Sequence, residues 1–193
     1  MPPAGPAALL EQASALLERA VGYTRTSLML VTDERMGAAT PCAGWDLAAL
    51  LRHMDDSLAA FSEAADLGYV APEPTAPTDP AAVVDSLKAR ACALLAAWSA
   101  EPAPAQTSVA GHSMPLPLLA GAGALEITVH GWDVAAACGS SRPIPDALAG
   151  LLLEVSDLVV GQPDRSTRFA DPVAVPLGAD ASTRLLALLG RRA

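Results

Sequence analysis

The stretch from Leu116 to Ala137 most constrains how this chain can fold, because its only charged residues are Glu126 and Asp133. We expect a helix over about Leu118 to Cys138, with Gly139 as its C-terminal stop. An ionised carboxylate in an apolar helix is costly unless it is paired or coordinated. The stretch has no Lys or Arg of its own. The partner is therefore either a bound metal ion or an Arg from another helix.

The acids in this stretch are regularly spaced around a histidine. Glu126 and His130 are four residues apart, and Asp133 follows three residues later. On a helix, which turns by roughly 100° per residue, all three side chains leave from one stripe. A carboxylate beside an imidazole suits a divalent metal such as zinc, although many surface helices contain such a pair by chance. Asp133 either orients His130 or a bound water from outside the ligand shell, or caps a local turn.

A third donor is available in the predicted helix from Leu47 to Leu67, for which Asp46 is a suitable N-cap. His53 lies roughly 110° from the centre of the leucine stripe of this helix. Its neighbours on that face are small and include Ser57, so they leave the space that a pocket needs. Ser57 is thus a candidate for contacting a substrate or cofactor. His112, in the Gly/Pro-rich loop before the apolar stretch, is a second candidate, although loop histidines are more often simply solvated.

Composition favours an all-α fold in one domain of 193 residues. Apolar residues make up 52% of the chain but aromatics only 4%, so the apolar content is mostly Ala, Leu and Val. A four-helix bundle with long Pro-rich connections and added C-terminal helices explains the pattern. The further predicted helices are about Pro6–Val31, Pro80–Ala100, Asp146–Val160 and Ala181–Gly190, with connections at Val70–Pro80 and Glu101–Pro117 and an irregular segment, with room for a short strand, at Arg165–Gly178.

The net charge and the cysteine content limit the classes of partner and the cellular compartment that we expect. The net charge of −9 argues against nucleic acid or an anionic membrane, and the apolar runs are too interrupted to span a bilayer. No signal peptide is recognisable at the N-terminus. Three widely spaced cysteines fit the reducing cytoplasm, and Cys42 is expected to pack rather than to react, since no His or Lys adjoins it. We expect a cytoplasmic monomer or homodimer that acts on a small molecule.

Four segments together resemble a known family. They are Thr40–Leu47 (TPCAGWDL), Leu51–Met54, Glu126–Asp133 and the closing Arg184–Gly190. The chain resembles the actinobacterial mycothiol-dependent maleylpyruvate isomerase N-terminal-domain family, part of the DinB/YfiT-like superfamily of metal-binding four-helix bundles. The resemblance implies that residues 1–193 form a single DinB-like bundle.

The resemblance also implies a ligand set and a chemistry. It makes His53, Glu126 and His130 the ligands of a divalent metal, most often zinc in relatives, and mycothiol a possible co-substrate that the metal activates. The implied reaction is attack of a thiolate on an electrophilic small molecule, as in a transferase or isomerase. The isomerase has a further C-terminal domain that contributes to its active site, and we expect the segment after Val160 to be too short and irregular to replace it. A metal-dependent hydrolase and a non-catalytic metal- or small-molecule-binding protein are the alternatives.

Overall fold

The computed structural model describes residues 6–67, 79–99, 106–109, 112–160 and 169–192. Within them the chain is mostly helical, which confirms the predicted all-α class. Most boundaries fall within three residues of those expected from the sequence. The elements are α1 (Pro6–Leu28), a short 3-10 turn η1 (Asp33–Arg35), α2 (Leu47–Leu67), α3 (Pro80–Ser99), β1 (Gln106–Val109), β2 (His112–Pro115), α4 (Leu116–Ala137), α5 (Asp146–Val159) and α7 (Ala181–Leu188).

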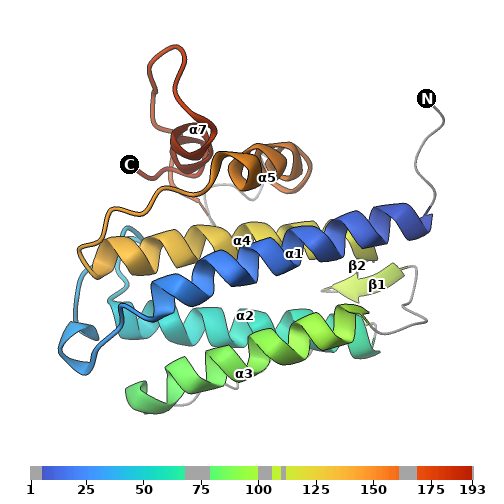
Figure 1. Ribbon diagram of the computed structural model, residues 1–193, viewed down its shortest axis with the longest axis horizontal. Helices are drawn as coiled ribbons and strands as arrows, with labels where there is room; N and C mark the ends of the chain where they lie inside the picture. The colour runs from blue at the N-terminus through green and yellow to red at the C-terminus, as the bar shows by residue number, and fades with distance from the viewer. Residues whose placement is uncertain (1–5, 68–78, 100–105, 110–111, 161–168, 193) are drawn as a thin grey trace.

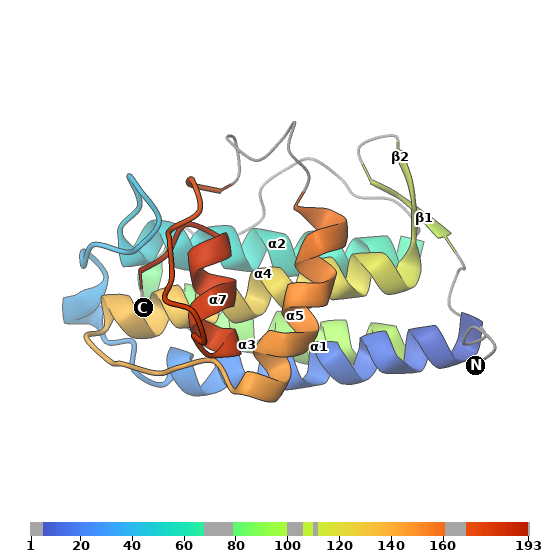
Figure 2. The same cartoon turned by 90° about the horizontal axis from the view of Figure 1, so that it is seen from above.

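The first four helices form the bundle, with α1 beside α4 and α2 beside α3 (Figure 1). Helices α5 and α7 cross one side of it, over α4 and α1 (Figure 2). The bundle interior is filled by leucines, which supports the predicted stripe on α2. The fully buried ones include Leu17, Leu47, Leu50, Leu51, Leu87, Leu94 and Leu116. None of the described helices is long and apolar enough to cross a membrane.

Close contact between α1 and α4 depends on Gly131. A Cβ atom at this position would overlap the hydroxyl oxygen of Thr24 on α1. That hydroxyl instead donates a buried hydrogen bond of 2.7 Å to the carbonyl oxygen of Ile127, one turn earlier on α4. The absence of a side chain at Gly131 therefore brings α1 against the face of α4 that adjoins Glu126 and His130.

The segment before α4 differs from the predicted loop, because it contains a short antiparallel hairpin. Gln106 pairs with Pro115 and Val109 with His112. Alternating β-branched residues favour this extended pairing, which the prolines and Gly111 obscured in the sequence. Helix α4 follows β2 directly and begins at Leu116 rather than Leu118, since a proline is tolerated in the first turn of a helix. The Pro-rich connection at Val70–Pro80 lies mostly outside the described residues, and residues 169–178 contain no strand.

Candidate functional site

The loop that precedes α2 is a compact turn that brings two side chains against α4. Asp46 caps α2 as predicted, its Oδ1 accepting from the amide of Ala49 at 2.7 Å. Thr40 closes the turn by hydrogen bonds with the backbone of Cys42 and Trp45. As a result the Trp45 ring lies 4.7 Å from the ring of His53, centre to centre, and the thiol of Cys42 reaches the residues around His130.

Helices α2 and α4 bring the three predicted metal ligands together. His53 Nε2 lies 2.7 Å from Glu126 Oε1, and His130 Nε2 lies 3.2 Å from the same oxygen. The two imidazoles are 5.1 Å apart between ring centres, nearly perpendicular to each other. Ser57 Oγ, one turn after His53, donates weakly to Glu126 Oε1 at 3.4 Å. Both ring nitrogens and the carboxylate therefore converge on one point.

Electrostatics make this cluster a strongly coupled set of charges. Burial by itself raises the pKa of Glu126, but the adjacent imidazoles of His130 and His53 outweigh burial and hold that pKa well below its usual range. Burial likewise lowers the pKa of His130, but Glu126 and hydrogen bonds with Asp133 and Cys42 raise it well above its usual range. The neighbouring carboxylates of Glu126 and Asp133 thus favour the protonated form of His130, which lies between them.

Asp133 contacts the ring nitrogen of His130 that does not face Glu126. His130 Nδ1 donates to Asp133 Oδ2 at 3.0 Å, and the Asp133 side chain is completely buried. Its second partner is Arg191, near the end of the chain, whose terminal nitrogen NH2 lies 2.8 Å from the same oxygen. An Arg from another element, one of the two partners left open by the sequence, therefore pairs with Asp133. His130 and Arg191 together lower the pKa of Asp133 against the opposing effect of burial.

Cys42 is a member of this cluster that the sequence did not indicate. No basic residue adjoins Cys42 along the chain, but the fold places Arg191 NH2 3.3 Å from its sulfur. The thiol donates to Asp133 Oδ2 at 3.2 Å and lies 3.8 Å from His130 Nδ1. The expectation that Cys42 only packs is incomplete, because its thiol contacts three polar side chains of the site.

A cavity of about 780 Å³ opens over His53, Glu126 and His130. The C-terminal segment forms part of its wall. That the residues after Val160 are too short and irregular to replace the isomerase's further C-terminal domain stays a prediction. Val173 N bonds to Ala187 O, which fixes this segment on α7. Lining residues from the segment are Phe169, Ala170, Leu189, Gly190 and Arg191; Trp45, Phe61 and Val129 also line the cavity.

Two groups of described residues have the geometry to hold a metal ion. One is His53, Glu126 and His130, and the other is Cys42, His130 and Asp133. In the second group Arg191 already donates to both Cys42 and Asp133. A cation there would have to displace a guanidinium, so the first group is the better candidate. The role of these residues as ligands stays a prediction.

The two further candidates from the sequence, Ser57 and His112, have different positions. Ser57 contacts Glu126 but is not among the residues that line the cavity of about 780 Å³, so its role in binding a substrate or cofactor stays a prediction. His112 begins β2, just before the start of α4, whereas His130 is near the end of that helix, about 20 Å further along it. The His112 side chain is outside the part of the chain that the structure describes, so its assignment also stays a prediction.

Fold and site together define a helical-bundle protein with a His/Glu/His cluster at the base of a cavity. Residues 17–135 match the family described as the mycothiol maleylpyruvate isomerase N-terminal domain. The chain therefore belongs to that family, as its motifs indicated. No curated protein matches the sequence.

Two solved structures share the fold. The crystal structure of the mycothiol-dependent maleylpyruvate isomerase superposes with a TM-score of 0.62 at 20% sequence identity, over 82% of this chain and 72% of that chain. A variant of that enzyme with one histidine replaced by alanine superposes with a TM-score of 0.63 at the same identity and coverage. These matches confirm the predicted DinB-like fold.

Proposed function

We propose that this protein is a metal-dependent enzyme, with zinc as the metal, that uses mycothiol in a transfer or isomerisation reaction on an electrophilic small molecule. The observation that carries the proposal is the convergence of three donor side chains, His53, Glu126 and His130, whose ligand atoms all lie within 4.8 Å of one another. They lie at the base of a cavity that is large enough for a thiol and a small substrate.

The donor set fits zinc. Two imidazole nitrogens and one carboxylate oxygen form a common three-residue set of catalytic zinc sites, which leaves a position open towards the cavity. Both imidazoles already direct Nε2 at the Glu126 oxygen, so one ion between them would contact all three. When bound, such an ion would favour the thiolate form of a coordinated thiol at neutral pH.

The surrounding residues orient the donor side chains. Asp133 accepts the Nδ1 proton of His130 and so leaves Nε2 as the atom that faces the metal position. Arg191 fixes Asp133 in turn, which keeps the imidazole from rotating. The Trp45 ring packs against the ring of His53. The chain thus supplies orientation as well as the ligands themselves.

The cavity favours a ligand with a polar end and a larger apolar part. Its polar lining includes His53, Glu126 and His130, while Phe61, Val129 and Phe169 contribute apolar wall. The solved relatives that share this fold are described as mycothiol-dependent maleylpyruvate isomerases. Those names support mycothiol as the thiol, and the substrate is proposed only as an electrophile.

The test is binding of mycothiol to the zinc-loaded protein, measured by isothermal titration calorimetry. We expect saturable one-to-one binding that disappears in zinc-free protein and in the His53→Ala variant. S-methylated mycothiol, which cannot form a thiolate, is the matched ligand control and should bind much more weakly. Zinc-loaded protein that ignores mycothiol but cleaves esters or amides would overturn the proposal in favour of a hydrolase that uses metal-bound water.

A further inference from the structure

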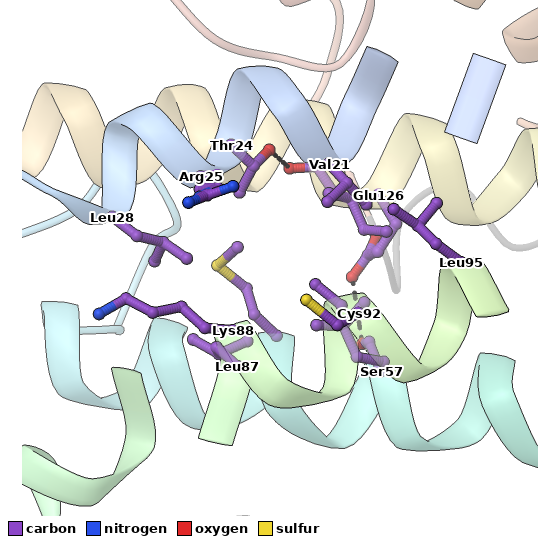
Figure 3. Close-up of a pocket in the computed structure, with 14 residues that line it drawn as sticks. Val21, Thr24, Arg25, Leu28, Ser57, Leu87, Lys88, Cys92, Leu95 and Glu126 are labelled. Atoms are coloured by element: carbon purple, nitrogen blue, oxygen red, sulfur yellow. Dashed lines mark hydrogen bonds between the residues drawn. The ribbon is translucent and has the colours of Figure 1, made fainter. Parts of the chain in front are cut away.

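A second cavity lies inside the bundle, on the other side of Glu126. Its volume is about 260 Å³, and all four bundle helices contribute to its wall. Figure 3 shows side chains of α1 and α3 facing each other across it, with Ser57 and Glu126 at one end. Most of its lining is hydrocarbon from Val21, Leu28, Met54, Leu58, Leu87 and Leu95. The cavity is separate from the larger one, although Glu126 contributes to both.

The opposite end of this cavity is basic. Arg25 and Lys88 lie on either side of Leu28 at this end, away from Glu126 (Figure 3). Lys88 is the only lysine of a chain with net charge −9. Among the described residues, the Arg25 side chain has no ion-pair partner. Lys88 Nζ lies 3.1 Å from Asp85 Oδ1, but the Asp85 side chain is 83% exposed. Replacing this ion pair by one between Lys88 and a bound anion therefore costs little free energy.

We infer that this cavity binds a small aliphatic carboxylate, with its chain among the leucines and its carboxylate between Arg25 and Lys88. Transfer of an alkyl chain from water to the apolar lining is favourable, and the two cations can form charge-assisted hydrogen bonds with the carboxylate. Ser57 and Glu126 lie at the other end of the cavity, away from both cations (Figure 3). The chain therefore enters first and the head group stays at the basic mouth.

Cavity size limits the length of the ligand. Ligand sites commonly measure about 300–1,000 Å³, and this cavity is just below that range. A medium-length chain such as that of decanoate is a suitable probe, whereas a long-chain fatty acid would extend into solvent. The inference does not depend on the proposed thiol chemistry, since neither basic residue belongs to the larger cavity.

The first experiment is calorimetric titration of the intact protein with decanoate and with decyltrimethylammonium, which has the same chain length and the opposite charge. We expect one-to-one binding of decanoate and no measurable binding of the cation. The double variant Arg25→Gln/Lys88→Gln should weaken decanoate binding about tenfold, as expected for two partly exposed ion pairs. The variant Arg19→Gln/Arg184→Gln removes the same charge from exposed positions outside the cavity and should bind like the wild type.

A second pair of variants tests the position of the alkyl chain. Ala91 lines the cavity, so Ala91→Phe should fill it and abolish decanoate binding. Ala93, two residues later on α3, is exposed, and Ala93→Phe should leave binding unchanged. Circular dichroism checks that each variant is folded. If Ala91→Phe does not fold, the comparison of Arg25→Gln/Lys88→Gln with Arg19→Gln/Arg184→Gln still tests the inference. Equal binding of decanoate and decyltrimethylammonium would overturn the inference, and so would decanoate binding that is unchanged in Arg25→Gln/Lys88→Gln.

Discussion

Arg191 forms a forked ion pair with Asp133, in which NH2 lies 2.8 Å from Oδ2 and Nε 3.3 Å from Oδ1. The Asp133 side chain is fully buried and that of Arg191 is 7% exposed. The pair connects the C-terminal segment to the helix that carries Glu126 and His130. It therefore couples the position of the last residues of the chain to the orientation of a predicted metal ligand.

Replacement of Arg191 by Gln should destabilise the fold by about 3 kcal/mol, because it removes one of the two cationic partners of the buried Asp133 carboxylate. Urea unfolding followed by circular dichroism measures this difference. The neighbouring Arg192 is exposed, so Arg192→Gln is the matched control and should change stability by less than about 0.5 kcal/mol. Equal stability of the two variants would mean that the Arg191–Asp133 pair contributes nothing to the fold.

Asp133→Asn should weaken zinc binding by about 10-fold to 100-fold, because the amide no longer fixes the His130 tautomer as a carboxylate does. Competition with a chromogenic zinc chelator measures the affinity. Asp157→Asn makes the same change at an exposed position of α5 and should leave the affinity unaltered. If Asp133→Asn binds zinc like the wild type, Asp133 does not orient a ligand.

The sequence was sufficient for the features that depend on local pattern. Helical periodicity placed α2 from Leu47 to Leu67, and the spacing of Glu126 and His130 together with the small-residue face of His53 identified side chains that the fold brings into contact. Cys42 and Arg191 could not be found this way, because their contacts join residues 91 and 58 positions from Asp133 along the chain. Such contacts follow from tertiary packing, for which one sequence carries no local signal.

Gly131→Ala should destabilise the protein by about 1–3 kcal/mol, because the added methyl group collides with Thr24 and forces α1 and α4 apart. Thermal unfolding gives the comparison. Gly22 on α1 has no neighbouring atom within 4 Å of an added Cβ, so Gly22→Ala is the control. It should instead stabilise the helix by up to about 1 kcal/mol. Destabilisation by both variants to the same degree would remove the special role of the contact with Thr24.

Zinc affinity should keep rising with pH above neutral, by up to about tenfold per pH unit while His130 stays protonated. The pKa of His130 is raised well above its usual range, so the metal-free imidazole still carries a second proton at neutral pH. Zinc must displace that proton from Nε2, and the cost decreases as the pH approaches the raised pKa. A histidine of ordinary pKa, about 6.5, would already be neutral and would give little dependence over this interval. Affinities measured in chelator-buffered zinc at several pH values distinguish the two.

We expect His53, Glu126 and His130 to hold one metal ion, and zinc titration of the untagged protein is the direct test of this assignment. The wild type should bind one zinc per chain, and Glu126→Gln should bind it at least hundredfold more weakly, a change larger than that expected for a residue outside the ligand shell. Cys42→Ser, which alters the alternative group of Cys42, His130 and Asp133, should bind zinc like the wild type. Absence of zinc binding by the wild type, or loss of zinc in Cys42→Ser but not in Glu126→Gln, would contradict it.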